Sequence, residues 1–279
     1  MNGIRLGGSG QRSTKRVLGS LAASLAILGS VSVSSLRAND LFYTISEVGS
    51  DLIEINVRSV GTTTTTLIGP TSGGFCISLA LSPWGTLYSM CGNLFGTQHL
   101  ATIDRGTGLA TVFGTGVSGL SVMAMKFGPD GTLYAVGNCN PVSGECAGPN
   151  SLYKVDTGSG AFTLVGPTSA PLFFMDLALD QSGNMYGVTS TLSPSGGPPA
   201  TLYRINLTTG AATKVVDLVG STSIMGLSFD QEKNKLYATD FYSFNSALYV
   251  VDLKTGFLTP VATTGYGFSS NLVPVPGTN

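Results

Sequence analysis

Charged side chains are scarce in this chain of 279 residues. Asp, Glu, Lys and Arg make up 10% of the sequence, whereas soluble proteins usually contain about a quarter. Five of the 14 basic residues and none of the 15 acidic residues lie before residue 39, so the remainder carries a net charge of −6. No basic stripe is left to release counterions from phosphates. We therefore exclude nucleic acid as a partner.

Histidine is almost absent, which excludes several kinds of catalytic centre. The only histidine, His99, opens a short strand at the edge of a loop. Neither a Ser-His-Asp arrangement nor a histidine-based metal site can be built around it. The chain also lacks the alternating acidic ligands of a loop-type calcium site. We expect no metal and no cofactor.

Helical periodicity is nearly missing as well, whereas the chain contains 38 glycines. Apolar residues follow a period of two or short continuous runs bounded by turn residues, which is typical of strands. The composition therefore predicts a turn-rich, all-β protein.

Residues 1–38 read as a signal peptide. Arg5, Arg12, Lys15 and Arg16 form a basic start, and the apolar run 17–33 is short for a membrane span. Cleavage could follow Ala38 or Ser35, and an uncleaved anchor is the alternative. This segment predicts export to the periplasm or outside the cell, with no transmembrane segment in the mature chain.

Two phrases alternate along the remaining chain, and each reads as a β-hairpin. The first contains a tight turn, such as Pro-Asp-Gly at 129–131, which presets the backbone angles that a hairpin needs. The second closes a strand on Asp or Asn and opens the next after Thr-Gly or Ser-Gly. The first phrase occurs at 77–90, 122–136, 175–188 and 225–239, and the second begins at 51, 99, 151, 201 and 247.

Four strands per repeat of 46 to 52 residues predict the blades of a β-propeller. The mature chain opens on a second strand at 41–45 and ends on a first strand at 265–273. The final segment can therefore complete the opening blade. We predict a five-bladed β-propeller of four-stranded antiparallel blades over 39–272, with a disordered tail at 273–279; six blades would need about one more repeat.

The phrase pair LxFxxxGxLYxV and LYxIDxxTGxxTxVG resembles the secreted bacterial β-propellers of the WD40/YVTN-like or quinoprotein-dehydrogenase-like repeat class. The resemblance covers about residues 40–272. It implies the fold but little about function, because that class spans enzymes, lectin-like modules and scaffolds. A quinone-dependent activity fits poorly, since few arginines are present to hold an acidic cofactor.

Four cysteines suit an exported protein in an oxidising compartment. They allow three pairings. With a turn at 82–85, Leu81 faces Thr86 and Cys76 faces Cys91, although a bulge would shift the register by one residue. Cys139 and Cys146 bracket a loop that contains Pro and Gly. We predict both bridges; free thiols or a metal are the alternatives, the latter disfavoured because no histidine lies near.

Long and dissimilar connections should gather on one face of the propeller, at 89–99, 137–150, 190–200 and 240–247. Such loops on a rigid frame are where binding residues usually lie. The candidate binding residues in these loops are Asn138, Asn140, Phe241, Tyr242 and Asn245.

Three carboxylates near that face, Glu47, Asp176 and Asp240, are the weaker candidates for acid and base catalysis. Most other aspartates fall in the repeated turns, where they should accept backbone N–H groups. We therefore predict a secreted binding or interaction module for carbohydrate, an envelope component or an extracellular protein. The alternatives are a glycosidase-like hydrolase or lyase, and a structural envelope protein without a small ligand.

Overall fold

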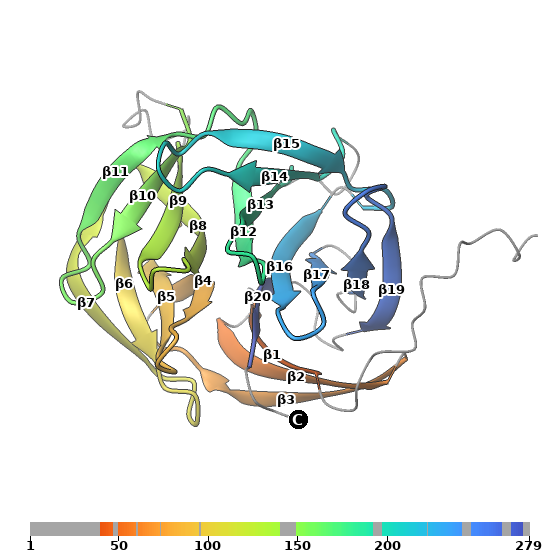
Figure 1. Cartoon of the computed structure of the whole chain (residues 1–279). Coiled ribbons are helices and arrows are strands. Elements are labelled where there is room, and N and C mark those ends of the chain that lie inside the picture. Colours follow the sequence, from red (N-terminus) through yellow and green to blue (C-terminus); the bar gives the residue numbers. More distant parts are fainter. Residues whose placement is uncertain are drawn as a thin grey trace, which may run out of the picture. The chain divides into compact units, whose positions relative to one another are not determined.

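The computed structural model describes an all-β propeller (Figure 1). It describes residues 40–46, 50–59, 61–72, 74–94, 96–139, 149–191, 197–221, 223–241, 247–263 and 269–275. All of them belong to one compact unit, Ser35–Asn279. Every regular element within these ranges is a strand, which confirms the predicted fold class.

The strands form five antiparallel sheets of four, and each sheet is one blade. Blade 1 contains β20 (Ser269–Pro274), β1 (Asp40–Ser46), β2 (Asp51–Ser59) and β3 (Thr62–Pro70). Blade 2 contains β4 (Phe75–Leu81), β5 (Leu87–Gly92), β6 (Gln98–Ile103) and β7 (Ala110–Val117). Blade 3 contains β8 (Leu120–Phe127), β9 (Leu133–Cys139), β10 (Ser151–Val155) and β11 (Phe162–Pro167). Blade 4 contains β12 (Phe174–Leu179), β13 (Met185–Thr189), β14 (Thr201–Ile205) and β15 (Ala212–Asp217). Blade 5 contains β16 (Ile224–Asp230), β17 (Lys235–Asp240), β18 (Ala247–Val251) and β19 (Leu258–Thr263).

The two ends of the described chain share blade 1. The last strand, β20, pairs antiparallel with β1, so that Tyr43 faces Val273. Figure 1 shows β20 with β4, β8, β12 and β16 around the centre of the ring. This confirms the predicted blade count and the predicted closure of the ring by the C-terminal strand. The closure pairs strand edges that an open ring would leave exposed.

The repeated aspartates do the structural work predicted for them. Asp156 accepts the backbone N–H groups of Gly158 and Ser159, at 3.1 and 2.6 Å. Asp104 and Asp252 make the equivalent contacts in their own turns. These bonds hold the turn between the third and fourth strands of a blade, as expected for an Asp that closes a strand.

Glycines near the end of the outer strands β3 and β11, Gly69 and Gly166, lie very close to the backbone of the next blade. A side-chain carbon placed on Gly69, in blade 1, would lie 2.2 Å from the carbonyl oxygen of Thr107 in blade 2. Gly166 in blade 3 meets Thr209 in blade 4 at the same 2.2 Å. No side chain fits such gaps, so Gly69 and Gly166 allow the backbones of neighbouring blades to approach closely.

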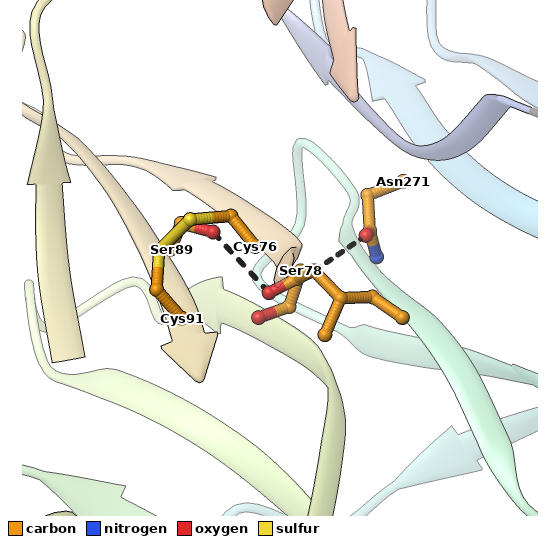
Figure 2. Close-up of a disulfide and its surroundings, with 6 residues drawn as sticks. Cys76, Ser78, Ser89, Cys91 and Asn271 are labelled. Carbon is orange, nitrogen blue, oxygen red and sulfur yellow. Dashed lines mark hydrogen bonds between the residues drawn. A yellow bond between two sulfur atoms is a disulfide. The ribbon is translucent and has the colours of Figure 1, made fainter. Parts of the chain in front are cut away.

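One cross-strand disulfide joins Cys76 and Cys91, as predicted (Figure 2). The two residues face each other on β4 and β5, with a Cα–Cα distance of 4.0 Å, and both are buried. The predicted register near the turn was wrong by one residue, because Leu81 faces Leu87 and not Thr86. A bulge between Ile77 and Leu79 corrects the shift before the cysteines are reached. The predicted Cys139–Cys146 bridge lies outside the described part of the chain, since 140–148 is not described.

Candidate functional site

Each inner strand carries a β-bulge in its pairing with the next strand. A bulge interrupts the hydrogen-bond ladder and leaves backbone groups without strand partners. At the centre of the ring these groups are buried, so they must find other partners. Two side chains, Asp176 and Asn271, provide them.

Asp176 lies on β12 and is 1% exposed. Its Oδ1 accepts the N–H of Leu177 at 2.8 Å, and its Oδ2 accepts the N–H groups of Leu227 at 2.8 Å and Leu272 at 3.0 Å. Burial raises the pKa of Asp176 to about 7, although these N–H donors and the charge of Lys126 act in the opposite direction. The carboxyl group thus connects blades 4, 5 and 1.

Asn271 lies on β20 and is fully buried, and it connects the remaining blades. Its Oδ1 accepts the N–H of Ser78 at 2.7 Å, as Figure 2 shows. Its Nδ2 donates to the carbonyl oxygens of Met123 at 2.9 Å and Met175 at 3.2 Å. Together the two side chains bond to backbone groups of all five inner strands. We call Asp176 and Asn271 the polar centre, because they link the five blades of the ring.

A cavity of about 490 Å³ lies where the five inner strands end. Its wall is formed by the last residues of β4, β8, β12, β16 and β20, by the turns that follow β4, β8 and β16, and by the start of β1. The volume is within the range of small-molecule sites. The cavity lies on the face of the short first-to-second-strand turns, opposite to the face of the long loops that sequence reasoning favoured.

Lys126, at the end of β8, is the distinctive residue of this wall. The hairpin register places Ala80, Ala178 and Ser228 at the same position in blades 2, 4 and 5. Lys126 is partly buried, and it has no hydrogen bond or ion pair within the described residues. Burial lowers the pKa of its ammonium group, while the charge of Asp176 raises it.

The other charges near the cavity are paired or at its rim. The Lys233 ammonium group bonds to Asp40 and lies 3.3 Å from Asp230. The hydroxyl of Tyr237 donates to Asp40 at 3.3 Å, and burial raises the pKa of that tyrosine. Glu232 is exposed at the rim. The cluster around Lys233 joins blades 5 and 1. Lys126 is the charged wall residue for which the described part of the chain provides no hydrogen bond or ion pair, although the charge of Asp176 acts on it from a greater distance.

The residues predicted to form a site on the loop face are partly described. Asn138 is fully buried, and its side-chain amide bonds to both the N–H and the carbonyl oxygen of Phe174, at 2.8 and 2.9 Å. Asp240 accepts hydrogen bonds from the hydroxyls of Ser221 and Ser223. Phe241 is partly buried and packs against an apolar cluster. Among the candidates, Glu47, Asn140, Tyr242 and Asn245 lie outside the described residues.

The described ranges contain neither a metal-binding cluster nor a membrane-spanning helix. No group of three or more His, Cys, Asp or Glu side chains there could hold a metal ion. Nor does that part of the chain contain a helix with the length and apolar character needed to cross a membrane.

A family profile described as "Repeat of unknown function (DUF6923)" matches residues 46–264. The chain belongs to this family. The match covers most of the propeller, and the function of this repeat family is unknown. A search of curated protein sequences finds no match.

Solved β-propeller structures resemble the fold of this family member. A protein of unknown function from Bacteroides thetaiotaomicron aligns over 85% of this chain and 65% of its own, with 13% identity and a TM-score of 0.53. A chain of the nidogen/laminin complex aligns over 84% of both chains, with 13% identity and a TM-score of 0.50. TolB from Acinetobacter baumannii has 14% identity and a TM-score of 0.49 over 81% of this chain. This chain spans about half of that TolB, 53%. The resemblance concerns the fold alone.

Proposed function

We propose that this protein is an exported binding module whose ligand enters the cavity at the end of the five inner strands. The observation that carries the proposal is the cavity itself: about 490 Å³, with wall residues from all five blades. A closed ring of packed sheets is a rigid frame, and a concave site on such a frame can be formed before the ligand arrives.

The proposed ligand is an envelope component or another small molecule that an exported protein meets, and glycans are one class to be tested. Export is supported by the apolar segment 17–33 with its basic start. The Cys76–Cys91 bridge supports it too, because disulfides persist in oxidising compartments.

A binding role is favoured over the glycosidase-like alternative because Asp176, one of the predicted catalytic carboxylates, is not available to a substrate. Asp176 has both oxygens occupied by backbone N–H groups and does not line the cavity. A glycosidase needs two carboxyl groups that flank the substrate bond. Asp176 in its present contacts does not provide one of them.

The test is a substitution that blocks the cavity mouth. Gln231 is exposed and lines the cavity, and Gln181 occupies the same place in the corresponding turn of blade 4 without lining it. The mature chain, Gln231→Trp and Gln181→Trp should be compared on a glycan array and in a thermal-shift screen of small metabolites.

Ligands that bind the parent chain and Gln181→Trp but not Gln231→Trp support the proposal. Ligands that bind all three equally, or a complete lack of ligands in both screens, overturn it. Circular dichroism of the three proteins establishes that both variants remain folded.

A further inference from the structure

We propose that the cavity binds a small organic anion, a carboxylate with an apolar body, through the ammonium group of Lys126 and the hydroxyl of Ser82. This inference rests on the proposed function, since it specifies the ligand of the same cavity.

The first argument is the isolation of Lys126. It has no hydrogen bond or ion pair to the described residues, and only the charge of Asp176, beyond ion-pair distance, acts on it. The Lys233 cation, by contrast, is shared by Asp40 and Asp230. Partial burial of an ammonium group without a partner weakens the fold. A carboxylate of a ligand would restore the missing partner.

The second argument is that the blade does not need a lysine at this position. Blades 2 and 4 place Ala80 and Ala178 here, and blade 5 places Ser228. These small residues are buried and pack without a charge. The long cationic side chain of blade 3 is therefore an addition to the repeat, and it is an addition that lines the cavity.

Ser82 provides a second donor on the neighbouring blade. It is 4% exposed, lines the cavity and follows β4. Its Oγ accepts the N–H of Thr86 at 2.8 Å, which leaves its own O–H free to donate. An ammonium group and a hydroxyl together suit the two oxygens of a carboxylate.

The rest of the wall indicates an apolar ligand body. Leu41, Leu81, Phe127, Leu179 and Phe229 all contribute to the lining. Apolar area of this kind favours a hydrocarbon or aromatic group over the hydroxyl-rich ring of a sugar acid.

The experiment compares carboxylates with their uncharged counterparts. Phenylacetate, cyclohexanecarboxylate and octanoate are titrated into the mature protein by calorimetry, each beside its primary amide and beside glucuronate. The variants are Lys126→Met, Lys126→Arg and Ser82→Ala. Lys254→Met, at an exposed turn outside the cavity, is the control.

We expect at least one apolar carboxylate to bind and its amide to bind much more weakly. Lys126→Met should weaken that binding by roughly tenfold to a hundredfold, the usual effect of losing a charge-assisted hydrogen bond. Ser82→Ala should weaken it by about fivefold. Lys126→Arg should retain most of the affinity, and Lys254→Met should retain all of it.

Three results would overturn the inference. One is equal binding of acid and amide, another is binding unchanged in Lys126→Met, and the third is that none of the apolar acids binds. In any of these cases, neutral ligands from the earlier screen that bind the parent chain but not Gln231→Trp would still support a binding function of the cavity. Only the proposal of an anionic ligand would then be wrong.

Discussion

Asp176 and Lys126 are charged residues on adjacent inner strands, and their surroundings differ sharply. Asp176 is fully buried at the ring centre, where it accepts three backbone N–H groups from three blades. Lys126 is partly buried at the cavity wall and bonds to no described residue. A charge with several internal hydrogen bonds holds the fold together, whereas a charge at a cavity wall that has no hydrogen bond to the described residues is available to a ligand.

The largest loss of stability is expected for a substitution at the ring centre. Asp176→Ala leaves the N–H groups of Leu177, Leu227 and Leu272 buried without acceptors. We expect a loss of about 3–5 kcal/mol in the free energy of unfolding, as for other broken buried networks. Urea denaturation at pH 7 measures it.

A turn aspartate provides the matched control for that measurement. Asp156→Ala also removes acceptors of backbone N–H groups, but at an exposed turn. Its loss should be about 1 kcal/mol, because water can replace the carboxylate there. Equal losses of unfolding free energy in the two variants would show that the polar centre stabilises the ring no more than an ordinary turn does.

The disulfide lies beside the same centre and tests whether blade 2 needs a covalent bond as well. Replacing both Cys76 and Cys91 with Ala removes a link between residues 15 apart in sequence. We expect about 3 kcal/mol of destabilisation, the usual size for a loop of this length. Urea denaturation of the double variant and of the parent checks this. An unchanged midpoint would mean that the strand pairing alone holds the hairpin.

The raised pKa of Asp176 predicts that the stability of the protein depends on pH. The native carboxyl group has a pKa of about 7, whereas an unfolded aspartate titrates near 3.9. Between these values the native state binds more protons, so stability falls as the pH rises from about 4 to 7 and is level above that range.

The size of this effect is about 2 kcal/mol between pH 5 and pH 7, from the limiting slope for one proton. Urea denaturation at intervals of half a pH unit measures it. Asp176→Asn cannot ionise, so its stability should show a smaller decrease over the same range. A slope identical to that of the parent would assign the dependence to other groups.

The fold could be predicted from the sequence because each repeat contains the turn and strand pattern of one blade. Turn residues and strand patterns recur with each blade, and a first strand without a second one at the C-terminal end predicted the closure through β20. The turn register in blade 2 was mispredicted, since nothing in the local sequence marks the bulge at Ser78. The glycines of the second phrase had a further role that only neighbouring blades reveal, at Gly69 and Gly166.

The cavity could not be predicted in the same way. Sequence reasoning looked for function in the long loops, because those segments depart visibly from the repeat. Lys126 departs from it too, but inside a strand, where a single letter among apolar ones attracts little notice. Aligning the inner strands by their turns would have identified Lys126, because Ala80, Ala178 and Ser228 occupy that position in other blades.

The smallest predicted change in stability is that of Lys126→Met, and its sign tests whether Lys126 serves binding or the fold. Lys126→Met keeps the length of the side chain and removes an ammonium group that is partly buried without a partner. The free energy of unfolding should therefore rise by about 1 kcal/mol, which raises the Tm by roughly 2–4 °C in a chain of this size. Scanning calorimetry of ligand-free protein measures this, with Lys254→Met as the exposed control. A residue that weakens the fold it belongs to is retained for another reason, and binding is the reason that its position offers. A fall in Tm would instead mean that Lys126 stabilises the ring, as Asp176 does, and the contrast between the two residues would disappear.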